Sequence, residues 1–122
     1  MEFIDIKNGY TQYDVEKVAG ILKLGGVVVV PTDTVYGIAA ASNSQEGIKK
    51  LYSVKGREYS KATSVLVSDV SMAKSISKGV SKEEEKVVKK FFPGPITIIL
   101  DKNDKVPDSI TGGGDTVRSK MP

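Results

Sequence analysis

The feature that most constrains this sequence is an uninterrupted β-branched run, Val27 to Val30, followed at once by proline. Such a run has no polar face, which is typical of a strand covered on both sides in an α/β sheet. Pro31 has no backbone N–H and ends the strand. A similar run, Val65 to Val67, lies further along the chain. We therefore expect an α/β domain in which buried strands alternate with helices.

Helix-capping patterns separate these runs. Thr11 and Ser81 each precede an acidic residue by three positions, which is the capping-box pattern, and apolar residues at helical spacing follow. Ser44 is the expected N-cap of a third helical segment. A further helix is expected from about Val70 to Gly79. The pattern predicts one domain over residues 1–122.

Shorter apolar segments complete the expected sheet. Phe3 to Ile6 alternates and is expected to form a short strand. The segments Ile38–Ala41 and Ile96–Leu100 are expected to form two more. Thr116 to Met121 is expected to begin another strand near the C-terminus.

Composition excludes several kinds of catalytic site. The chain has no cysteine and no histidine, so thiolate chemistry, Ser-His-Asp chemistry and histidine-ligated zinc are excluded. The net charge of +3 is compatible with a nucleotide or RNA partner, although a lysine-rich solvated surface explains it equally simply. The lack of cysteine and of long apolar runs fits a cytoplasmic protein that does not enter a membrane.

Polar segments follow several of the expected strands and helices. Thr32 and Thr34 lie in a loop after the Val27 strand, where α/β sheets bind ligands, although a plain turn is the simpler interpretation. Lys55 and Arg57 flank a glycine at a helix end, where they would either hold phosphate oxygens or cap the helix dipole. Gly112 to Gly114 would let backbone amides approach a phosphate, but a triple glycine is weak evidence.

Taken in order, these segments resemble the YrdC/Sua5 family. The resemblance rests on Gly26–Gly37, Lys55–Arg57, Phe92–Leu100, Asp115–Val117 and the final Met121-Pro122. It implies a YrdC-like twisted, mixed open α/β sheet with flanking helices around a large cavity. It also implies a threonylcarbamoyl-AMP synthase, which joins L-threonine, bicarbonate and ATP with the help of Mg²⁺ and releases pyrophosphate. The product serves t6A modification of tRNA, so tRNA, double-stranded RNA and other t6A-pathway proteins are the implied partners.

The resemblance also implies roles for particular residues. Thr34 and Lys120 would bind threonine, and Lys55 and Arg57 would be the catalytic pair that faces the ATP phosphates. The remaining implied positions are the nucleotide contacts Arg57, Lys61 and Thr116, and the supporting loop residues Thr32 and Tyr36. No residue is implied as a metal ligand.

The sequence also departs from the family pattern. Glu58 stands where a proline is usual, and Lys120 stands where the family's TVxVRxP motif has arginine. The Ser-x-Asn motif lies beyond Pro122 in the family, so the chain matches the N-terminal two-thirds of the domain. From this we expect an incomplete sheet, self-association and slow synthase turnover by the chain alone.

Two other functions remain open at this point. The chain could be a non-catalytic nucleotide- or RNA-binding YrdC-like module. A carbamoyl-transfer relative would share the same motifs, but it usually carries zinc-binding segments that this sequence lacks.

Overall fold

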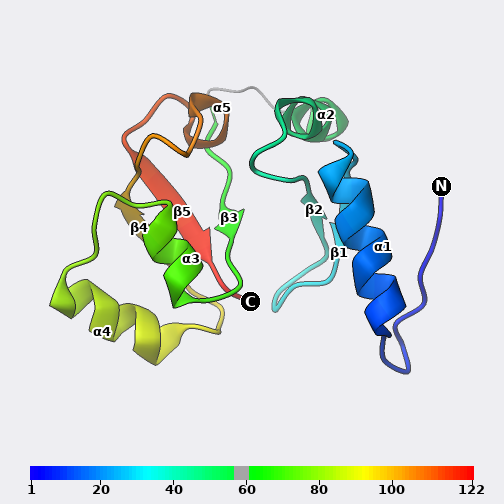
Figure 1. The fold of residues 1–122 in the computed structure, drawn as a ribbon, viewed down its shortest axis with the longest axis horizontal. Coiled ribbons are helices and arrows are strands. Elements are labelled where there is room, and N and C mark those ends of the chain that lie inside the picture. The colour runs from blue at the N-terminus through cyan, green and yellow to red at the C-terminus, as the bar shows by residue number, and fades with distance from the viewer. Residues whose placement is uncertain (57–60) are drawn as a thin grey trace.

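The computed structural model describes residues 1–56 and 61–122. Helices and strands are interspersed along the chain, and Figure 1 shows them as two groups that lie side by side. The elements are α1 (Gln12–Lys23), β1 (Val28–Val30), β2 (Gly37–Ala39), α2 (Gln45–Lys55), β3 (Val65–Leu66), α3 (Val70–Ser75), α4 (Lys82–Phe91), β4 (Thr97–Asp101), α5 (Asp108–Thr111) and β5 (Thr116–Lys120). The predicted α/β class is confirmed.

The strands of the described residues form two small sheets. β1 and β2 are an antiparallel pair, in which Val29 lies opposite Ile38. The other sheet has the order β3-β5-β4, so β5 is its central strand. β5 runs parallel to β3 and antiparallel to β4, which makes this sheet mixed.

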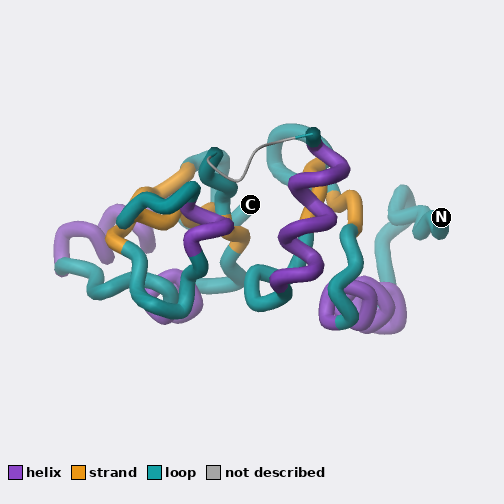
Figure 2. Tube along the Cα trace, turned by 90° about the horizontal axis from the view of Figure 1, so that it is seen from above, coloured by secondary structure: helices purple, strands orange, loops and turns teal. Residues whose placement is uncertain are grey.

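The predicted capping residues begin the helices where expected. The Thr11 and Ser81 hydroxyls accept the backbone N–H of Asp14 and Glu84, and both acids return a hydrogen bond, so both capping boxes are formed. Ser44 caps α2 by accepting the N–H of Gly47 at 3.0 Å. Figures 1 and 2 show α1 and α2 crossing steeply, because each is seen along its length in the view where the other is seen end-on.

Three details differ from the sequence prediction. Phe3 to Ile6 forms no strand and Phe3 is exposed, because no neighbouring strand of the described chain pairs with this segment. Val29 is 66% exposed, so β1 is not covered on both faces; within the described chain β1 pairs with β2 alone. α3 ends at Ser75 rather than near Gly79, because Ser77 instead forms a bridge with Lys102.

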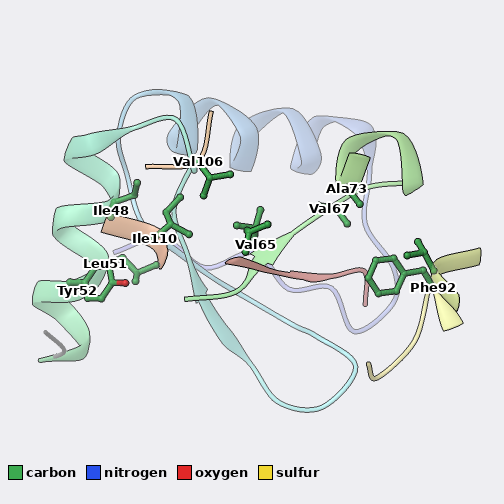
Figure 3. Close-up of a cluster of buried hydrophobic side chains, with 11 residues drawn as sticks. Ile48, Leu51, Tyr52, Val65, Val67, Ala73, Phe92, Val106 and Ile110 are labelled. Carbon is green, nitrogen blue, oxygen red and sulfur yellow. The ribbon is translucent and has the colours of Figure 1, made fainter. Parts of the chain in front are cut away.

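The hydrophobic core joins the two groups of elements. Figure 3 shows Ile48, Leu51 and Tyr52 of α2 in the same cluster as side chains from the β3 region and from the segments around α3, α4 and α5. Val117 of β5 is 1% exposed at the centre of the sheet. Because side chains alternate along a strand, Val117 and Ser119 point into the core while Thr116 and Arg118 point outward.

Apolar side chains and strand edges are left uncovered. Ile99 of β4 and Leu66 of β3 are 59% and 41% exposed, and these two strands are the edges of the three-stranded sheet within the described chain. Exposed edges favour pairing with another chain. The expected self-association stays a prediction, which size-exclusion chromatography across a range of concentrations would check. None of the helices in the described part of the chain is long and apolar enough to cross a membrane.

Ser119 generates a prediction about stability. Its side chain is fully buried, and no described residue makes a hydrogen bond with its Oγ. A buried hydroxyl without a partner loses its hydration and regains nothing. We therefore expect Ser119→Ala to leave the free energy of unfolding unchanged or to raise it by up to about 1 kcal/mol.

The neighbouring Val117→Ala variant is the control, because it removes buried apolar volume from the same strand and should cost about 2 kcal/mol. Urea denaturation measures the free energy of unfolding of both variants, provided that their m-values equal that of the wild type. A loss of more than about 1 kcal/mol in Ser119→Ala would show that this hydroxyl has a partner.

Candidate functional site

Thr32 holds together the loop between β1 and β2. Its hydroxyl donates a hydrogen bond to the carbonyl of Val35. The same oxygen accepts the backbone N–H groups of Thr34 and Val35 at 3.4 and 3.3 Å. Hydrogen bonds between a side-chain hydroxyl and the backbone a few residues away stabilise a tight turn. The Thr32 side chain therefore fixes the shape of this turn.

Thr34 and Tyr36 are presented by this loop. Both residues are exposed, and the Thr34 hydroxyl lies 3.4 Å from that of Thr32, at the limit of a hydrogen bond. The turn is therefore built by one threonine and leaves the donor and acceptor capacity of the other largely unused. A hydroxyl in this position suits a small polar ligand.

An ion pair connects the loop to the end of β5. Lys120 Nζ lies 3.3 Å from Asp33 Oδ1, and the two side chains are only 20% and 17% exposed. The backbone of the loop is exposed, so the carboxylate itself is turned inward. Because β1-β2 and β3-β5-β4 are separate sheets, this pair joins one sheet to the other. It lies at the predicted threonine site, beside Thr34.

The outward face of β5 continues from this ion pair. Thr116, Arg118 and Lys120 alternate with the buried Val117 and Ser119, so all three share that face. Hydrogen bonds from Val67 N–H to the Lys120 carbonyl and from Gly94 N–H to the Met121 carbonyl, both 2.9 Å, fix this end of the strand. The face is therefore carried by rigid backbone rather than by a loop.

Lys55 and Lys61, two of the residues predicted to contact ATP, lie apart from this loop. Lys55 is the last residue of α2, and Gly56 caps that helix with a left-handed φ of 62°. Figure 1 places α2 and the loop between β1 and β2 at opposite ends of the β1-β2 sheet. Lys61 is exposed, and its carbonyl accepts a hydrogen bond of 2.8 Å from the Tyr52 hydroxyl. Arg57 lies outside the described residues.

The structure thus brings some predicted site residues together and leaves others apart. Thr32, Thr34 and Lys120 gather where the loop meets β5, and Thr116 lies on the same strand face. Lys55 and Lys61 make no hydrogen bond or ion pair through their side chains to this group within the described chain. The sequence prediction missed Asp33 and Arg118. The period-two alternation of β5 could have found Arg118, whereas no local signal pairs Asp33 with Lys120.

Comparison with known proteins identifies the family. The model of the Sua5_yciO_yrdC family, described as "Telomere recombination", matches residues 20–122. The threonylcarbamoyl-AMP synthase of Pyrococcus abyssi is 32% identical over 98% of this chain, and that of Bacillus subtilis is 31% identical over 98%. The chain therefore belongs to the Sua5/YciO/YrdC family, as the sequence motifs indicated.

Solved structures of relatives agree with this assignment. P. abyssi Sua5 complexed with L-threonine matches 99% of this chain with a TM-score of 0.86 and 32% identity. Full-length HypF in a phosphate- and nucleotide-bound form matches 93% of the chain with a TM-score of 0.76 and 27% identity. The chain spans about a third of the length of the two synthases, 35% and 36%, and 15% of HypF.

The Asp33–Lys120 pair yields a prediction about coupling between the sheets. Both side chains are mostly shielded from water, so their attraction is screened less than that of surface charges. A double-mutant cycle of Asp33→Ala and Lys120→Ala should give a coupling free energy of about 1 kcal/mol. Chemical denaturation of the wild type, both single variants and the double variant measures it.

Glu46 and Lys50 provide the matched control. Their charged atoms are also 3.3 Å apart, but the side chains are 69% and 51% exposed. This pair should couple by only about 0.3–0.5 kcal/mol. Equal coupling in the two pairs would show that burial does not strengthen the contact between the sheets.

Proposed function

We propose that this chain supplies the threonine- and ATP-binding face of a threonylcarbamoyl-AMP synthase. The observation that supports this best is the fixed loop that presents Thr34 beside the Asp33–Lys120 pair. A hydroxyl and a cation at adjacent positions complement the side-chain hydroxyl and the carboxylate of threonine. The similarity to P. abyssi Sua5 complexed with L-threonine supports the same ligand.

The reaction requires positioning and charge neutralisation rather than a covalent enzyme intermediate. The threonine amine takes up bicarbonate with loss of water and becomes a carbamate. A carbamate oxygen then attacks the α-phosphorus of ATP, a phosphorus–oxygen bond breaks, and pyrophosphate leaves. Cations stabilise the charge on the phosphates during such a transfer. This is the role we propose for Lys55 and Arg57, with Lys61 and Thr116 as further nucleotide contacts.

Magnesium fits this proposal as part of the substrate. Within the described residues no group of three or more Asp, Glu, His or Cys side chains could hold a metal ion. Mg²⁺ is commonly carried by nucleotide phosphates and water with few protein ligands. We therefore propose that it arrives as the MgATP complex, and we assign no ligand for it in the protein.

The pathway assignment belongs to the same proposal. The product would serve t6A formation in tRNA in the cytoplasm, together with other proteins of that pathway. The net charge of +3 also suits a module that binds tRNA or double-stranded RNA without catalysis. Release of pyrophosphate that requires both threonine and bicarbonate distinguishes a synthase from such a module.

Thr34 gives the first test of the proposed ligands. Thr34→Val keeps the shape of the side chain and removes its hydroxyl. We expect the dissociation constant for L-threonine to rise by up to about tenfold, the value of one neutral hydrogen bond. Isothermal titration calorimetry of the chain measures it. Thr116→Val is the matched control, because it should weaken ATP binding and leave threonine binding unchanged; the reverse pattern would exchange the two assignments.

Arg57 gives a second test, which rests on the sequence motif. Arg57→Ala should weaken ATP binding by about 1.5–3 kcal/mol, the value of a charge-assisted contact. Lys49→Ala removes one positive charge from the exposed surface of α2 and should change ATP affinity little. Equal affinities of wild type and Arg57→Ala in calorimetry would remove Arg57 from the nucleotide site.

A further inference from the structure

Arg118 occupies the middle of the strand that carries the candidate site. It lies on the outward face of β5, between Thr116 and Lys120. Neighbours at every second position of a strand lie roughly 7 Å apart along the same face. One ligand can therefore reach Arg118 together with either of its neighbours. β5 is hydrogen-bonded on both sides, so this position is more fixed than a loop residue would be.

The charges on this face leave Arg118 available. The ammonium of Lys120 already has a counter-charge, because Asp33 lies 3.3 Å away. The side chain of Arg118 makes no hydrogen bond or ion pair with residues 1–56 or 61–122. The acid nearest to it by strand register is Asp101, which lies opposite Thr116 on β4 and forms no ion pair with Arg118. Within the described residues, Arg118 is thus the cation of this face whose side chain has no charged partner.

Apolar side chains flank the outward face of β5 at Arg118 and Lys120. Ile99 lies directly opposite it on β4 and is 59% exposed, and Leu66 lies opposite Lys120 on β3. A ligand that covered these exposed apolar side chains would displace water from around Arg118, which strengthens its contact with the charge. A guanidinium also offers two parallel donors to a carboxylate or phosphate, which the ammonium of Lys120 does not.

We infer that Arg118 is the principal oxyanion-binding residue of the β5 face and that Lys120 assists it. The inference rests on the proposed function and names a further binding residue for it. The ligand is a small molecule that carries a carboxylate or phosphate group. Threonine and ATP are the two sources of such a group, and separate titrations distinguish them.

The test measures binding of L-threonine, MgATP and pyrophosphate to the 122-residue chain by calorimetry. Arg118→Gln should raise the dissociation constant by about tenfold or more for the ligand whose oxyanion it holds. Arg118→Lys keeps the charge but loses the paired donors, so it should give a smaller rise. Lys120→Gln should also give a smaller rise than Arg118→Gln, because Asp33 already engages its ammonium.

Two controls separate this effect from general charge and from folding. Lys86→Gln removes one exposed charge from α4, and it should leave all three affinities unchanged. Asp33→Asn removes the counter-charge of Lys120. In that background, Arg118→Gln should therefore raise the dissociation constant by a smaller factor than it does in the wild type. Circular dichroism melting of each variant shows whether it remains folded, since an exposed side chain should not change the melting temperature.

The outcomes separate this inference from the proposed function. If threonine and ATP bind equally well to wild type and Arg118→Gln, the inference is wrong and the proposed function stands. If neither substrate binds but pyrophosphate binds through Arg118, the oxyanion site stands and the synthase assignment falls. If none of the three ligands binds, or if Lys86→Gln weakens binding as much as Arg118→Gln, the inference is overturned.

Discussion

The pairing of β5 between β3 and β4 is the constraint on which the rest of the structure depends. Hydrogen bonds on both sides fix the strand, and its alternation then decides which side chains enter the core. Val117 and Ser119 point into the interior, so Thr116, Arg118 and Lys120 point to the opposite face. The chemistry of the candidate site follows from the same strand geometry that builds the core.

Local signals in the sequence predicted local structure well. The capping boxes at Thr11 and Ser81 placed two helix starts correctly, because a cap is a contact within one turn. The run from Val27 to Val30 correctly predicted a strand. It did not predict how far that strand is buried, because burial depends on which elements pack against it. The four valines are equally apolar whether the strand is covered on both faces or, as here, lies in a two-stranded sheet with Val29 exposed.

The candidate site likewise has features that the sequence could predict and features that it could not. The motif around Thr34 could be recognised from its sequence, and the hydrogen bonds of Thr32 explain why that stretch forms a fixed turn. The contact between Asp33 and Lys120 could not be predicted, because the two residues belong to different sheets and only the tertiary fold brings them together. Arg118 falls at a position that the family's TVxVRxP motif leaves unspecified, although strand alternation places it on the same face as Lys120.

The loop between β1 and β2 assigns different tasks to two identical side chains. The Thr32 hydroxyl forms hydrogen bonds with the backbone of the loop, whereas Thr34 is exposed to solvent. If Thr34 contacts the ligand as proposed, the shape of the loop and its selectivity are under separate control. Under that proposal, a change at position 34 would alter which small molecule is preferred without rebuilding the turn, so relatives with one backbone could diverge in substrate at this position.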